Sequence, residues 1–109
     1  MSTNKLYRQG DVLLIPTDKA FPKGAKPAPL DGGRVILAYG EVTGHCHEVI
    51  GDVEFLAADL DEMADRFLRV EKEASVVHDE HTTIRLPAGD YVVRRQREYT
   101  PTEIRRVAD

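Results

Sequence analysis

The 109-residue chain contains no tryptophan, a single cysteine (Cys46) and no apolar run long enough to cross a bilayer or to form the core of a signal peptide. A lone cysteine excludes a disulfide within the chain. We therefore expect no membrane association and a reducing cytoplasm as the compartment. Lys and Arg number 15 against 19 Asp and Glu, and the resulting net charge of −4 opposes general attraction to a nucleic-acid backbone.

The length matches one domain with a single modest core, so we assign residues 1–109 to one domain. Hydrophobic residues make up 41% and charged residues 31%, which is a globular balance. Four prolines and three glycines between Pro16 and Gly33 interrupt both strand and helix. We expect a flexible surface loop over about residues 16–33, to which we assign no chemistry.

Short apolar, β-branched segments separated by turn residues predict a mainly β fold, either a small barrel or a sandwich. The expected strands cover residues 6–16 with a bulge at Gly10, 34–39, 47–50, 53–57, 82–86 and 91–94. Gly51-Asp52 and the segment Pro87–Asp90 are expected to be hairpin turns. Residues 59–73 fit a helical turn followed by a strand. A capping-box pattern from Thr100 to Glu103 predicts a short C-terminal helix over residues 104–108.

All four histidines fall into two tight doublets, His45-Cys46-His47 and His78-Asp79-Glu80-His81. Neutral imidazole is the commonest protein ligand for transition metals. On a strand, His45 and His47 share one face, whereas Cys46 points to the other, where we expect it to be a small core residue. His78 and His81 can lie together either across a tight hairpin with Asp79-Glu80 at its tip or on one helical turn.

The sequence therefore predicts a divalent transition-metal site formed by His45, His47, His78 and His81. Imidazole ligands favour Zn first, with Fe, Ni or Mn as alternatives, and disfavour Ca and Mg. Four histidines would close the coordination sphere of a structural ion, whereas three would leave a position open for a small-molecule substrate. For such a catalytic site, Glu41 and Glu80 are the candidate general bases. Glu48 should point away from the site.

Two other functions stay open. Arginines and tyrosines near the end of the chain could bind single-stranded nucleic acid through charge and base stacking (Arg94, Arg95, Arg97, Arg105, Arg106, Tyr91 and Tyr99). We consider a solvated strand face and helix the better explanation, because the whole chain is acidic. The other alternative is a metal-stabilised structural protein without catalysis, which could form a homo-oligomer.

The segments His45-Cys46-His47 and Pro87-Ala88-Gly89 partly resemble the two motifs of cupins, small β-barrels in which a His-x-His strand and a later histidine hold a metal. The resemblance implies a barrel built around a metal ion. No histidine follows Pro87-Ala88-Gly89, and no glutamate follows His47 at the usual distance. The resemblance therefore carries over no catalytic residue.

A second resemblance covers most of the chain and is carried by four blocks of sequence. These are Tyr7-Arg8-Gln9-Gly10-Asp11-Val12, the segment from Gly40 to His47, His78-Asp79-Glu80-His81, and Gln96-Arg97-Glu98-Tyr99-Thr100-Pro101. They resemble the signature blocks of a group of small uncharacterised proteins from bacteria and their phages. This resemblance implies relatives but no particular reaction.

Overall fold

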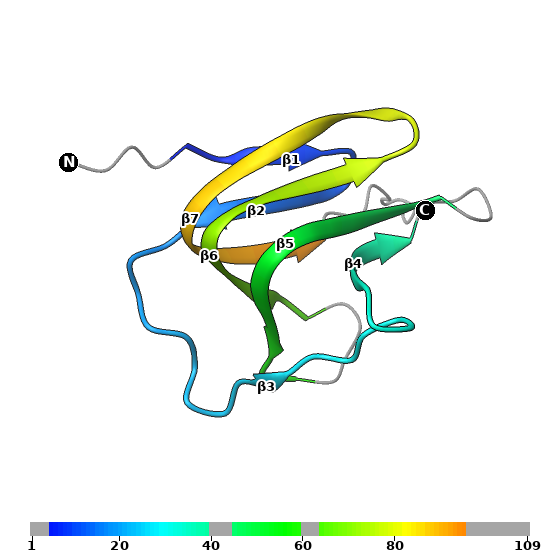
Figure 1. The fold of residues 1–109 in the computed structure, drawn as a ribbon. Helices are drawn as coiled ribbons and strands as arrows, with labels where there is room; N and C mark the ends of the chain where they lie inside the picture. The colour runs from blue at the N-terminus through cyan, green and yellow to red at the C-terminus, as the bar shows by residue number, and fades with distance from the viewer. Residues whose placement is uncertain (1–4, 40–44, 60–63, 96–109) are drawn as a thin grey trace, which may run out of the picture.

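The computed structural model describes residues 5–39, 45–59 and 64–95. Within these ranges the chain forms one antiparallel sheet of seven strands (Figure 1). The strands are β1 (Tyr7–Gln9), β2 (Val12–Pro16), β3 (Lys26–Pro27), β4 (Val35–Tyr39), β5 (Cys46–Ala57), β6 (Arg66–His78) and β7 (His81–Arg95). The predicted helix over residues 104–108 and the candidate base Glu41 lie outside the described residues. The mainly β class is confirmed.

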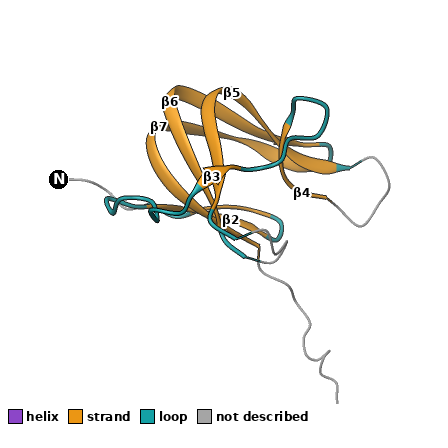
Figure 2. Ribbon diagram, turned by 90° about the horizontal axis from the view of Figure 1, so that it is seen from below, coloured by secondary structure: helices purple, strands orange, loops and turns teal. Residues whose placement is uncertain are grey.

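The strand order is β1-β2-β7-β6-β5-β3, with β4 also paired to β5. In the described part of the chain no ladder joins β1 to β3 or β4, so the sheet is not closed, and the expectation of a barrel or a two-layer sandwich is wrong. The sheet is strongly curved without closing into a barrel, because β5, β6 and β7 bend sharply along their length (Figures 1 and 2). The sheet thereby wraps around its own core as one layer.

The pairing of the long strands is irregular at two places near their middle. The β5–β6 register shifts between Gly51 and Val53, and the β6–β7 register shifts between Val70 and Glu73. The hairpins predicted at Gly51-Asp52 and Pro87–Asp90 are therefore wrong, because each segment continues as one long strand. Glycine is required at position 51. Its φ is +141°, and an added Cβ would lie 2.7 Å from the carbonyl oxygen of Glu73.

In the N-terminal segment, a predicted continuous strand is divided by a turn. Instead of one bulged strand over residues 6–16, Gly10-Asp11 forms a tight turn between β1 and β2, which pair Gln9 with Val12. Gly10 has a φ of +58°, a left-handed conformation that glycine adopts without steric cost. The turn leaves Gln9 buried, with the residue only 2% exposed.

The proline-rich loop is mostly irregular, as expected, but it contains β3 and an isolated bridge between Asp31 and Arg34. The strand predicted at residues 34–39 is confirmed as β4. The strand expected near the end of residues 59–73 begins at Arg66, and most of the preceding helical turn falls on residues 60–63, outside the described part.

None of the residues that the structure describes belongs to a helix long and apolar enough to cross a membrane.

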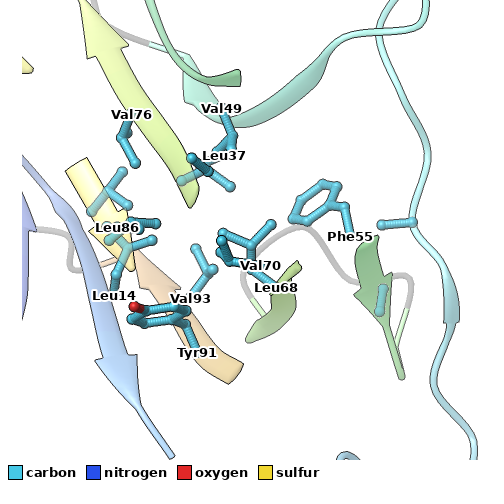
Figure 3. Packing of buried hydrophobic residues seen from close by; sticks show 14 residues of the cluster. Leu14, Leu37, Val49, Phe55, Leu68, Val70, Val76, Leu86, Tyr91 and Val93 are labelled. Carbon is cyan, nitrogen blue, oxygen red and sulfur yellow. The ribbon is translucent and has the colours of Figure 1, made fainter. Parts of the chain in front are cut away.

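The core lies on the concave side of the sheet and combines aliphatic residues from β2, β4, β5, β6 and β7 (Figure 3). Leu14, Leu68 and Leu86 are completely buried. Burial of each such side chain stabilises the fold by about 1.5–3 kcal/mol relative to exposure. The start of β5 and the β6–β7 turn extend beyond this core at one end of the sheet, where the histidines gather.

Candidate metal centre

The structure brings all four histidines together at one end of the sheet. The ring centroids of His47, His78 and His81 form a triangle with sides of 4.4, 4.6 and 5.7 Å. His45 lies next to this group, and its ring centroid is 5.8 Å from that of His78. The two doublets therefore meet in space although they are separated by about thirty residues.

Strand pairing explains how the second doublet is formed. His78 ends β6, His81 begins β7, and the two residues are register partners across the turn Asp79-Glu80. Of the two alternatives left open by the sequence, the hairpin tip is therefore the one that forms. The backbone N–H of Glu80 donates a hydrogen bond of 3.0 Å to Nδ1 of His78, which closes the turn.

Gln9 is part of the site although the sequence assigned it no role. Its amide Nε2 donates to the backbone carbonyls of Val76 and Thr82, both at 3.0 Å. Because only the NH₂ group can donate to two carbonyl oxygens, the amide orientation is fixed. Oε1 therefore faces Nδ1 of His47 at 2.8 Å, and it must accept a hydrogen bond from Nδ1–H. The one hint in the sequence is that Gln9 lies within the block Tyr7–Val12.

This hydrogen bond determines the tautomer of His47, which is 5% exposed. Burial, assisted by the neighbouring imidazoles of His78 and His81, lowers the pKa of His47 to about 4, while Asp11 acts in the opposite direction. The ring is therefore neutral near pH 7, and with its proton on Nδ1 it carries a bare lone pair on Nε2. Metal-binding histidines commonly have their other ring nitrogen fixed by such a hydrogen bond.

Gly10 brings the β1–β2 turn directly against the histidines. A Cβ at this position would lie 3.0 Å from Nε2 of His81 and 3.3 Å from Cε1 of His47. Any side chain would therefore occupy the space in front of these two rings. The glycine keeps this space open and also adopts the backbone conformation that the turn requires.

His45 lies between two carboxylates. Its Nε2 is 3.6 Å from Oδ2 of Asp79, and its Nδ1 is 3.8 Å from Oε2 of Glu80. Glu48 is on the opposite face of β5 from His47, as expected, and lies 3.7 Å from Arg34. Cys46 is half-buried and is not part of the hydrophobic core, contrary to its predicted place there.

The spacing of the ring centroids is compatible with a shared ion. Imidazoles bound to one tetrahedral zinc lie roughly 5 Å apart between centroids, since each nitrogen is about 2 Å from the metal. The observed distances bracket this value. However, within residues 5–39, 45–59 and 64–95, no three side chains of His, Cys, Asp or Glu already have their donor atoms arranged to hold a metal. The hydrogen bond from the backbone N–H of Glu80 occupies Nδ1 of His78.

The arginine and tyrosine group proposed for nucleic acid is less available than the sequence suggested. Tyr91 is 3% exposed and donates its hydroxyl hydrogen to the carbonyl of Pro87, so it cannot stack on a base. Arg94 forms a two-point ion pair with Asp65, and Arg95 donates to the carbonyl of Ala64. Arg97, Tyr99, Arg105 and Arg106 lie outside the described residues.

Fold and site together define a small single-sheet β protein with a histidine cluster fixed by a buried glutamine. The model of the family described as Domain of unknown function (DUF8820) matches residues 8–96. The chain belongs to this family. The matched range contains Gln9, Gly10 and all four histidines. No curated protein and no solved structure matches the chain.

Proposed function

We propose that this protein binds one divalent transition-metal ion at the histidine cluster, with Zn²⁺ as the first candidate and Fe, Ni or Mn as alternatives. The observation that carries the proposal is the hydrogen bond between Gln9 and His47. A buried amide with both ends committed holds a neutral imidazole with an unprotonated Nε2, and the centroid of this ring lies 4.4 and 5.7 Å from those of two further histidines. The lone pair of an imidazole nitrogen is what a transition metal requires.

Binding requires a small rearrangement at His78. The ring must release Nδ1 from the backbone N–H of Glu80, or place its proton there and bind through Nε2. This hydrogen bond is exposed, so its loss costs about 1 kcal/mol. Structural zinc sites contribute about 10–16 kcal/mol of binding free energy at neutral pH. The cost of turning His78 is therefore small compared with the gain.

The proposal concerns binding and does not include a reaction. The carboxylate of Glu80 faces His45, and Glu41 lies outside the described residues. A site formed by β5, β6, β7 and the β1–β2 turn would connect the N-terminal hairpin to the long strands. This arrangement is consistent with a stabilising role and would also accommodate a catalytic one.

The Gln9→Met variant tests the proposal. Methionine has a similar length but cannot accept a hydrogen bond from Nδ1 of His47, so we expect the dissociation constant for Zn²⁺ to rise 10- to 100-fold. The measurement is a competition titration with a chromogenic chelator on protein without a histidine tag. Tyr91→Phe is the matched control, because it removes a partly buried hydrogen bond between Tyr91 and Pro87, neither of which contacts a histidine ring, and should leave zinc affinity unchanged.

Two results would contradict the proposal. If wild-type protein fails to compete with the chelator for Zn²⁺, Fe²⁺, Ni²⁺ or Mn²⁺, the cluster does not bind such metals. If Gln9→Met and wild type bind zinc equally well, the orientation of His47 is irrelevant to binding.

A further inference from the structure

The face of the sheet opposite the core carries a row of apolar side chains that crosses four strands. Along β2, β5, β6 and β7, buried core residues alternate with residues that point to this other face. The strand register aligns one such residue from each strand, and we call these four residues the outer row (Ile15, Val92, Phe67 and Leu56). Each of them is half-buried.

A line of charges runs beside the outer row. Arg69 forms ion pairs with Asp90 at 3.0 Å and with Glu54 at 3.3 Å. Each of these three residues lies two positions along its strand from a member of the row, and residues two apart on a strand share a face. The outer row is therefore an apolar strip on the same side of the sheet as these partly exposed charges.

The loop after β2 packs on one part of the outer row. The ring centroid of Phe21 lies 5.3 Å from that of Phe67, and the guanidinium of Arg69 lies over the Phe21 ring at 5.0 Å. Val92 and Ile15 lie one and two strands beyond Phe67, on β7 and β2. An apolar strip on one face of a sheet is stabilised when another element packs on it.

The chain that follows β7 starts close to this end of the row. β7 ends at Arg95, three residues beyond Val92, which is about 10 Å of strand. Residues 96–109 follow and are long enough to turn back over that distance. In the helix predicted for residues 104–108, Ile104 and Val107 share one face. A helix this short gains its stability from packing on another element.

We infer that the C-terminal segment 96–109 folds back over the β2–β7 end of the outer row and covers Ile15 and Val92 with Ile104 and Val107. The sheet offers an apolar strip within reach, and the segment offers an apolar pair that has to be packed. Contact between them removes both from water. This inference does not depend on the proposed metal site.

Urea denaturation of the full chain gives the first test. Ile104→Ser/Val107→Ser should raise the equilibrium constant for unfolding by about tenfold or more, because two apolar side chains lose their burial. Arg105→Ser/Arg106→Ser is the matched control, since it changes two residues of the same segment that point away from the row in the predicted helix. Its equilibrium constant should stay within about twofold of wild type. Equal effects of the two double variants would overturn the inference.

Disulfide formation measures the contact itself. In full-length protein that carries Cys46→Ser, the pair Ile15→Cys/Val107→Cys should form a disulfide within one chain under mild oxidation. Ile50→Cys/Val107→Cys is the matched control, because Ile50 is 55% exposed and lies on β5 six positions from Leu56. A rate for the control pair equal to that of the first pair would overturn the inference. A disulfide that joins two chains through position 15 would assign the row to a second copy of the protein and would equally overturn it.

Discussion

At the scale of single residues, the site depends on a side chain that carries no metal-binding chemistry of its own. Gln9 contacts β6 and β7 through two carbonyls and orients His47 on β5. Histidines are conspicuous in a sequence, but a glutamine that orients one of them is not. The role of Gln9 depends on a contact between residues 38 positions apart, which local sequence patterns cannot predict.

Gly10 provides a prediction with a close control. Gly10→Ala would place a methyl group in front of His81 and His47, so we expect zinc affinity to fall by more than tenfold. Gly32 has nearly the same φ, +59° against +58°, but an added Cβ there meets nothing within 4 Å. Gly32→Ala should therefore show the same backbone strain, about 1–2 kcal/mol in unfolding experiments, with unchanged zinc affinity. Equal zinc affinities in the two variants would contradict the role assigned to Gly10.

The buried His47 predicts a pH dependence of stability in metal-free protein. Its pKa is about 4 in the folded state against about 6.5 when unfolded, so between these values the unfolded chain binds the additional proton. The contribution of His47 is present above pH 6.5 and is lost as the pH falls toward 4. Urea denaturation in the presence of a chelator should show this decline.

The His47→Gln variant isolates the contribution of that single residue. Glutamine can still donate a hydrogen bond to Oε1 of Gln9 but does not titrate, so its free energy of unfolding should decline less steeply between pH 6.5 and 4. The same slope in both proteins would mean that other groups cause the dependence.

At the scale of elements, the local sequence does not distinguish a turn from an irregularity within a strand. The sequence pattern at Gly10 predicts a bulge, but Gly10 forms a turn, whereas the patterns at Gly51 and Gly89 predict turns, but both glycines lie within long strands. All three glycines have positive φ values. Local sequence therefore identifies where the backbone departs from regular strand geometry. Whether the chain reverses there depends on its pairing with distant strands, which the local pattern does not specify.

Gly51 and Gly89 allow a test of the bend in β5. Both have similar φ values, +141° and +149°, but an added Cβ at Gly51 would lie within 3.0 Å of Glu73 and Ala74, whereas one at Gly89 meets nothing within 4 Å. We expect Gly51→Ala to reduce the free energy of unfolding by about 1–3 kcal/mol more than Gly89→Ala. Thermal or urea denaturation measures the difference, and equal losses would show that the close approach of β5 and β6 at the bend is not needed.

At the scale of the whole molecule, alternation and turn chemistry were sufficient to predict a small β protein, and the two histidine doublets were sufficient to propose a site. They could not predict that one curved sheet would replace a barrel or sandwich. The long strands β5, β6 and β7 are bent (Figure 1), and their pairing contains register shifts that no local sequence pattern predicts. The same curvature allows the turn at Gly10, which belongs to the far end of the strand order, to reach the histidines on β5 and at the β6–β7 turn.

The curved sheet thus gathers residues from the N-terminal hairpin and from three long strands at one end of the molecule. Metal binding there is the central claim, and it concerns the protein as a whole because the ligands come from both histidine doublets. The carboxylates of Asp79 and Glu80, which face His45, favour it because negative charge attracts cations.

The most direct test is elemental analysis of protein produced without a histidine tag, before and after incubation with each candidate metal and removal of the excess. We predict about one equivalent of zinc or another first-row metal per chain, and less than about a tenth of this in the His47→Ala/His81→Ala variant. Less than about a tenth of an equivalent in the wild type, not restored by Zn, Fe, Ni or Mn, would contradict the account.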